Sequence, residues 1–287
     1  MLWITMGTVV RTPYDDRVTT APDLTAPIGI FDSGFGGLTV ARAIVDQVPG
    51  EDIVYLGDTA HAPYGPRPIR KVREYALACL DSLVELGVKT LVIACNTASA
   101  VVLADARERY DVPLVEVIRP SARRAAHVSK SGRIGVLCTK ATAKSAAYDD
   151  ALAATGVVPT TAVCAPFVDF VEAGVTSGPE LLDAARTCLR PVVAAGADTV
   201  ILGCTHYPLL SGVISYVLGD DVTLVSSAME CADATYAVLA REGLLRTDQA
   251  QGKHRFLTTG NPDRFEAIGR RLLGDFLHGV EAADEAG

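Results

Sequence analysis

The sequence predicts an α/β protein made of two pseudo-symmetric, doubly wound domains whose parallel-rich sheets face a central cleft. Short apolar runs alternate with amphipathic stretches, a pattern typical of parallel sheets covered by helices on both faces. The first half of the chain is also repeated in the second. The two most similar segments, Leu91–Thr97 and Val200–His206, each end an apolar run with a cysteine followed by small polar residues.

The composition is that of a globular protein, and it argues against several classes of function. The chain has 287 residues, of which 49% are hydrophobic and 21% charged. A net charge of −8 argues against a general binder of nucleic acids or anionic membranes. Seven scattered cysteines without a CxxC pair favour reduced thiols in a cytoplasm over a disulfide framework or a zinc site. No apolar run approaches the roughly 20 residues of a membrane span.

Residues 1–26 are expected to form a flexible N-terminal extension. Their apolar part is too short for a signal peptide, and translation could start at Met1 or at Met6. Ordered structure is expected from Pro27. Residues 27–117 with 225–287 should form the first α/β domain, and residues 118–224 the second.

The first ordered unit is a strand, a glycine-rich turn and a helix. Ile28–Phe31 is apolar, Asp32–Gly37 contains three glycines, and apolar residues then recur at helical spacing from Leu38 to Val48. Such a unit presents backbone N–H groups to anions. The turn is neither a Walker sequence nor a GxGxxG fingerprint, so alone it is a weak signal.

The remaining elements follow in the same alternation. In the first half we expect strands over Asp52–Gly57, Leu91–Ala94 (the first cysteine strand) and Pro113–Val117. A proline-containing loop should cover Asp58–Pro66. One helix should span Pro68–Leu86, and another should follow the cysteine strand through Ala106. The pattern restarts near Ile118–Pro120, where Ile134–Thr139 matches Ile28–Ser33 position for position. A helix from Thr142, a strand over Val158–Cys164, and helices over Phe167–Glu172 and Pro179–Ala195 lead to the second cysteine strand. A helix (Met229–Ala240), a strand (His254–Thr258) and a helix (Pro262–Leu273) should return to the first domain, and the acidic tail Glu281–Gly287 should be frayed.

Five polar residues follow predicted strands, namely Asp32, Asp58, Cys95, Thr139 and Cys204. In parallel sheets the carboxyl ends of the strands share one rim, where ligands bind. Two such rims facing each other would place Cys95 and Cys204 in one cleft.

Two thiols suit a reaction that inverts a carbon by moving its proton, because one base is needed on each face. A free cysteine has a pKa near 8.5, so thiol and thiolate are both reachable. Asp32 is the candidate activating neighbour of Cys95, His206 that of Cys204, and Glu172 is a third ionisable candidate. No lysine lies in a motif for a pyridoxal Schiff base, so the simpler mechanism uses no cofactor and no metal.

The stretches IGIFDSGFGGLTV, YLGDTAHAPYG, VIACNTASA, FVDFVEAG and LGCTHYPLL resemble, in this order, the glutamate racemases of the aspartate/glutamate racemase superfamily. The resemblance covers nearly the whole chain from Pro27. It implies cofactor-independent interconversion of L- and D-glutamate, supplying D-glutamate for peptidoglycan in the cytoplasm. It also implies that Cys95 works on D-glutamate and Cys204 on L-glutamate, with Asp32, Glu172 and His206 assisting. The substrate-binding positions that it implies, with Thr139 added from its strand end, are Asp32, Ser33, Tyr64, Gly65, Asn96, Thr97, Thr139, Thr205 and His206.

Each of these residues also has a plainer interpretation. Asp32 and Asp58 could cap helices, Tyr64 could pack the proline loop, and Glu172 could lie on the surface. His61 is assigned no role. The other cysteines are expected to be core residues, at positions 79, 138, 164, 188 and 231.

Three alternatives stay open. One is a racemase for aspartate or another amino acid, or a related isomerase. Another is a thiol-redox or peroxide-sensing protein that forms a disulfide between Cys95 and Cys204. The third is a non-catalytic module that binds an acidic amino acid. We expect a small-molecule substrate and neither a nucleic-acid nor a membrane partner; the oligomeric state, including a homodimer, is left open.

Overall fold

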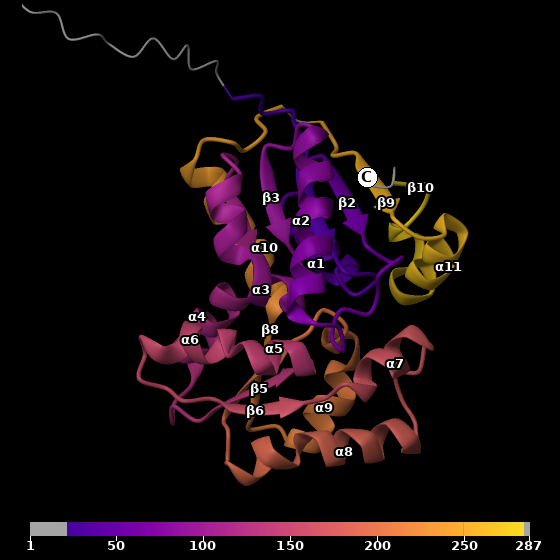
Figure 1. Ribbon diagram of the computed structural model, residues 1–287. Helices are drawn as coiled ribbons and strands as arrows, with labels where there is room; N and C mark the ends of the chain where they lie inside the picture. Colours follow the sequence, from indigo (N-terminus) through magenta and orange to yellow (C-terminus); the bar gives the residue numbers. More distant parts are fainter. Residues whose placement is uncertain (1–21, 249, 284–287) are drawn as a thin grey trace, which may run out of the picture.

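The computed structural model describes residues 22–248 and 250–283, which form two parallel sheets stacked as two lobes (Figure 1). The six-stranded sheet has the order β10-β9-β2-β1-β3-β4, and the four-stranded sheet has the order β6-β5-β7-β8. The strands are β1 (Ile28–Asp32), β2 (Ile53–Gly57), β3 (Thr90–Ile93), β4 (Leu114–Glu116), β5 (Ile134–Cys138), β6 (Thr160–Val163), β7 (Thr199–Gly203), β8 (Thr223–Ser226), β9 (His254–Thr258) and β10 (Val280–Ala282).

Helices connect the strands and cover the sheets. They are α1 (Leu38–Gln47), α2 (Ile69–Glu85), α3 (Asn96–Arg109), α4 (Ile118–Val128), α5 (Lys140–Ser145), α6 (Ala147–Ala153), α7 (Pro166–Glu172), α8 (Pro179–Ala194), α9 (Ser211–Leu218), α10 (Ser227–Arg241) and α11 (Pro262–Leu273), with 3₁₀ turns η1 (Tyr207–Leu210) and η2 (Gly274–Phe276).

The two sheets share one topology, which confirms the predicted pseudo-symmetric α/β fold. The order β2-β1-β3-β4 in the first sheet matches β6-β5-β7-β8 in the second, and every pairing within both is parallel. Strands β3 and β7 are therefore equivalent; Cys204 follows β7 directly, and Cys95 follows β3 after Ala94. The central strands β1, β3, β5 and β7 are buried along their whole length, as expected for strands covered on both faces.

A continuous apolar core joins the lobes. Helix α10 leaves β8 of the second sheet and packs against α1 of the first lobe and α4 of the second. Its buried residues belong to one cluster that includes Ile28 of β1 and Ile201 of β7. We propose that the two domains expected from the sequence follow the two sheets; strand β8 spans the expected boundary between residues 224 and 225.

Three local predictions were wrong. Helix α4 was missed, because Pro120 looks like an interruption although it lies in the first turn, where no intrahelical N–H is needed. The helix expected from Thr142 begins at Lys140 and is divided at Ala146, which has a φ of 56°. Glu281 is not frayed but pairs in β10 beside β9, with its carboxylate 2.7 Å from Arg255 Nη2.

Part of the predicted termini, residues 1–21 and 284–287, lies outside the described residues. Within the part that is described, none of the helices is both long enough and apolar enough to cross a membrane.

Candidate active site

One cavity of about 260 Å³ lies between the carboxyl ends of the two sheets and receives both cysteines. Eight of the nine expected substrate-binding residues line it, Asp32 being the exception. The full lining is Ser33, Pro63, Tyr64, Gly65, Pro66, Cys95, Asn96, Thr97, Thr139, Lys140, Ala165, Val168, Asp169, Cys204, Thr205 and His206. Cys95 and Cys204 are 5% and 6% exposed, and both line this cavity.

Cys95 is the N-cap of α3. Its sulfur lies 3.4 Å from the Ala98 N–H of the first helical turn and 3.3 Å from Ser33 Oγ, which comes from the loop after β1. Burial, and to a smaller extent the nearby Asp32 carboxylate, raise the pKa of Cys95 to about 12. The contacts with Ser33 and with the Ala98 N–H lower this pKa, but their effect is smaller. At neutral pH Cys95 is therefore a thiol, and the helix N-terminus and Ser33 are placed to support its thiolate when it forms.

Cys204 lies in a different environment, because it is linked to two ionisable groups. His206 Nδ1 lies 3.8 Å from Cys204 Sγ, and His206 Nε2 lies 3.2 Å from Glu172 Oε1 at the end of α7. Burial lowers the basicity of His206, but its contacts with Cys204 and Glu172 outweigh burial and raise its pKa to about 10. His206 is thus an imidazolium at neutral pH, placed to pair with a Cys204 thiolate.

Asp32 lies beneath the cavity rather than in its wall. It is 1% exposed, and its Oδ2 accepts hydrogen bonds from Gly34 N at 3.0 Å and from the Tyr55 hydroxyl at 3.4 Å. Burial raises the pKa of Asp32. Its Oδ1 is a buried acceptor without a hydrogen-bond partner among the described residues, so Asp32 can accept one further donor from the site. Its bond to Gly34 shows that it also holds the glycine loop, but the capping role considered from the sequence was wrong, because no side chain among the described residues caps the N-terminus of α1.

The glycine loop, which joins β1 to α1 in the first lobe, also contacts the second lobe. A Cβ at Gly36 would lie 2.2 Å from Thr205 Oγ1 and 2.5 Å from His206 Nδ1, so only glycine fits there. Thr39 Oγ1, in the first turn of α1, donates to Thr205 O at 2.9 Å. The loop after β1 therefore sets the position of the residues that follow Cys204.

The polar residues that follow Cys95 also meet the second lobe. Thr97 Oγ1 lies 2.9 Å from Thr139 Oγ1, and the Asn96 side chain bridges the Tyr148 hydroxyl at 2.7 Å and Ser227 Oγ at 3.4 Å. The Asn96 amide was expected to hold a substrate carboxylate, but these neighbours already occupy its carbonyl oxygen and one of its N–H groups. Tyr148 and Ser227 were missed, because no local pattern links them to Asn96.

Asp58 shapes the wall of the cavity and caps no helix. Its buried carboxylate accepts from Tyr64 OH at 2.5 Å and Thr259 Oγ1 at 2.6 Å, and lies 2.9 Å from His61 Nδ1. Tyr64, which does pack the proline loop, is held so that the loop presents Pro63–Pro66 to the cavity. Lys140 and Asp169 also line the cavity and were not identified from the sequence.

The five remaining cysteines lie away from the cavity wall. Four are buried and Cys188 is half-buried, consistent with the expected core positions.

Comparison with known proteins agrees with this geometry. A sequence profile of the family described as Asp/Glu/Hydantoin racemase matches residues 28–235. A glutamate racemase of Parafrankia sp. is 62% identical over 263 residues, covering 91% of this chain and 95% of that protein. The crystal structure of a glutamate racemase isoform of Bacillus anthracis superimposes with a TM-score of 0.88 at 39% identity, covering 92% of this chain and 99% of that one. The glutamate racemase of Francisella tularensis in complex with D-glutamate gives a TM-score of 0.85 at 30% identity, covering 91% and 98%.

The chain therefore belongs to the Asp/Glu/Hydantoin racemase family and, within it, to the glutamate racemases.

Proposed function

We propose that this protein interconverts L- and D-glutamate by moving the Cα proton between Cys95 and Cys204, one thiol on each face of the substrate. The observation that most supports it is the arrival of both sulfurs, from equivalent strand ends of two related sheets, in one cavity. Family membership points to amino-acid racemisation, and the names of the relatives supply the substrate. The product D-glutamate would serve peptidoglycan synthesis, as the resemblance to glutamate racemases implies.

The surroundings of the two thiols favour a direction for the resting enzyme. A Cys204 thiolate paired with the His206 imidazolium removes the Cα proton of L-glutamate, and the electron pair left on Cα is delocalised into the adjacent carboxylate. Cys95, a thiol because of its raised pKa of about 12, donates its proton to the opposite face. The products are D-glutamate, a Cys204 thiol and a Cys95 thiolate. Turnover of D-glutamate follows the same steps in reverse.

The neighbouring residues would assist each half-reaction. Ser33 and the Ala98 N–H stabilise the Cys95 thiolate, and Glu172 holds the His206 imidazolium beside Cys204. Asp32 lies buried beneath the cavity, and its Oδ1 has no hydrogen-bond partner among the described residues. Through this oxygen it would accept a hydrogen bond from the substrate ammonium or influence the protonation of the two thiols. Hydroxyls of Ser33, Thr97, Thr139 and Thr205 and the first N–H groups of α3 would bind the carboxylates.

Incubation with L-glutamate in D₂O without added cofactor tests this proposal. Loss of optical rotation together with deuterium at Cα is expected for the wild type. Cys95→Ala and Cys204→Ala should each abolish racemisation, whereas Cys79→Ala, a buried cysteine outside the cavity, should retain it. Absence of both inversion and exchange with glutamate would contradict the proposal, and the same assay with aspartate would then test the nearest alternative.

A further inference from the structure

A second cavity, of about 470 Å³, adjoins the active site and has a cationic lining. It is lined by Gly65, Pro66, Arg67, Pro68, Ile69, Lys140, Ala141 and Lys144, which include three cations and no carboxylate. Gly65, Pro66 and Lys140 also line the active-site cavity, so the two spaces adjoin along these residues. Lys140 is the one lysine or arginine that lines both.

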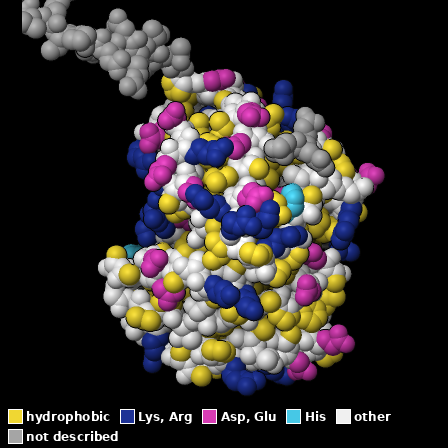
Figure 2. All heavy atoms as spheres, in the orientation of Figure 1, with side chains coloured by type: hydrophobic (Ala, Val, Ile, Leu, Met, Phe, Trp, Pro, Cys, Tyr) yellow, Lys and Arg dark blue, Asp and Glu magenta, His cyan; other side chains and the backbone are white. Residues whose placement is uncertain are grey.

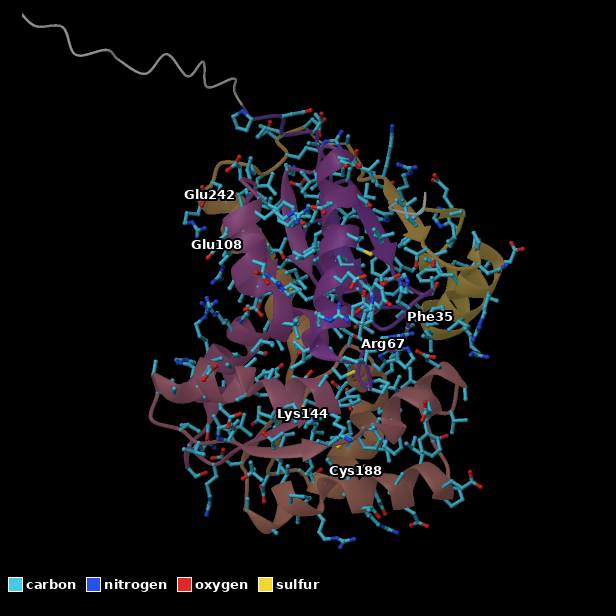
Figure 3. The ribbon with its side chains drawn as sticks, viewed as in Figure 1. Phe35, Arg67, Glu108, Lys144, Cys188 and Glu242 are labelled. Atoms are coloured by element: carbon cyan, nitrogen blue, oxygen red, sulfur yellow. The ribbon has the colours of Figure 1, made fainter. Side chains whose placement is uncertain are left out.

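The three cations come from both lobes. Arg67 lies in the loop between β2 and α2, whereas Lys140 and Lys144 belong to α5. Figure 3 shows Arg67 and Lys144 on facing sides of the region between the lobes, and in Figure 2 Lys and Arg side chains gather across the middle of the same face. A ligand that enters between the lobes from this side passes these residues.

The positive charges are not neutralised by nearby acids. Within residues 22–248 and 250–283, none of Arg67, Lys140 and Lys144 has an ion-pair partner. Arg67 is instead held by backbone carbonyl oxygens: its Nε donates to His61 O, and its Nη2 lies 3.4 Å from Ala62 O. Backbone carbonyls fix the guanidinium without cancelling its charge. The cluster is therefore a local positive potential on a chain whose net charge is −8.

We infer that Arg67, Lys140 and Lys144 form a cationic entrance that captures the dicarboxylate substrate and favours acidic over neutral amino acids. The inference rests on the proposed function. Glutamate carries two carboxylates and one ammonium at neutral pH and so enters as an anion. Inside the active-site cavity, the Asp169 carboxylate and the proposed Cys204 thiolate offset the charges of Lys140 and of the His206 imidazolium, so much of the attraction for an anion comes from the entrance.

The test compares Lys144→Gln and Lys144→Glu with Lys130→Glu at ionic strengths of about 0.02 M and 0.5 M. Lys130 is exposed, lies before β5 at the opposite end of the second sheet, and lines neither cavity. Lys130→Glu therefore changes the net charge as much as Lys144→Glu does, but away from the proposed entrance. At low salt we expect KM to rise about twofold to threefold for each unit of charge removed at Lys144, with the effect on KM rather than on kcat. At high salt the difference should vanish. Lys140→Gln with Lys144→Gln should raise KM further.

Calorimetric titration with glutarate, a dicarboxylate without an α-ammonium, gives a readout that needs no chemistry. Its Kd should follow the same order among the variants. The inference is overturned by an equal effect of Lys130→Glu, by a KM and a glutarate Kd that do not respond to Lys144, or by a loss confined to kcat. Failure of the wild type to racemise glutamate would instead remove the proposed function, and the glutarate titration would still test the entrance.

Discussion

The two thiols differ more in their surroundings than in their exposure. Cys95 is next to a hydroxyl and a backbone N–H, neither of which is ionisable near neutral pH, and burial keeps it protonated. Cys204 has an imidazolium at 3.8 Å, itself held by Glu172. The pseudo-symmetric backbone thus places two thiols in unequal surroundings, which suits the proposed mechanism, in which one is a thiol while the other is a thiolate.

This asymmetry predicts unequal alkylation. At pH 7 iodoacetamide should modify Cys204 about tenfold or more faster than Cys95, because the thiolate is the nucleophile and the two sulfurs are equally buried. His206→Asn should slow Cys204 toward the rate of Cys95, because the imidazolium 3.8 Å from the Cys204 sulfur is then lost. Mass spectrometry of the two peptides measures both rates. Equal rates in the wild type would contradict the assigned protonation states.

At the scale of residues, the sequence identified those whose role follows from position along a strand. Cys95, Cys204, Thr139 and Thr205 all follow β3, β5 or β7, and parallel strands deliver their ends to one rim. The residues that support them were not predictable in this way. Tyr148 reaches Asn96 across 52 positions of sequence, and Thr259 reaches Asp58 across 201, distances over which no periodicity operates.

Among the elements, the glycine loop between β1 and α1 connects the two lobes most closely. It belongs to the first lobe by sequence, yet Gly36 is in contact with Thr205 and His206 of the second. The strand–turn–helix pattern predicted the loop and its approach to anions. It did not predict this contact, because the pattern describes only one lobe, whereas the fit of the loop depends on both.

Gly36→Ala should therefore impair catalysis strongly. The added Cβ would displace Thr205 or His206, and a misplacement of about 1 Å near the reacting groups can cost about 100-fold in rate. We expect a loss of that order in kcat/KM, with about 1–3 kcal/mol of destabilisation from overpacking. Gly212→Ala in α9, where a Cβ would meet nothing within 4 Å, is the matched control and should keep activity. Kinetics and urea unfolding of both variants measure these effects; near-normal kcat/KM for Gly36→Ala would contradict the argument.

Element boundaries show where sequence patterns fail for a physical reason. Strand β9 and helix α11 begin and end at the predicted residues, because turn signals flank both. Strand β10 was not predicted, since Val280–Ala282 has only three residues, too few for an alternating pattern to be recognised. It forms because the free edge of β9 accepts it and because Arg255 pairs with Glu281. Helix α4 was not predicted, because Pro120 in its first turn looks like an interruption of the helix.

For the whole molecule, one apolar core spans both lobes, in addition to a smaller apolar cluster within each lobe. Helix α10 starts at the end of β8 and packs on α1 and α4, so it joins the two lobes (Figure 1). The internal repeat predicted two similar halves, but the sequence placed the helix that joins them outside the repeat, whereas α10 follows β8 as α4 follows β4. A common core implies that the cavity between the lobes is maintained by packing as well as by polar contacts such as that between Thr39 and Thr205.

The shared core predicts that both lobes unfold together. Leu239 of α10 is fully buried in this core, and Leu239→Ala should lower the free energy of unfolding by about 2–5 kcal/mol through lost burial and the cavity left behind. Because the core spans both sheets, the variant should still show one calorimetric transition, with equal calorimetric and van't Hoff enthalpies, at a lower temperature. Val158→Ala, at a position 86% exposed, should change stability by less than about 0.5 kcal/mol. Two separate transitions, with only one displaced by Leu239→Ala, would instead mean that each sheet folds around a core of its own and that the cavity depends on the polar contacts alone.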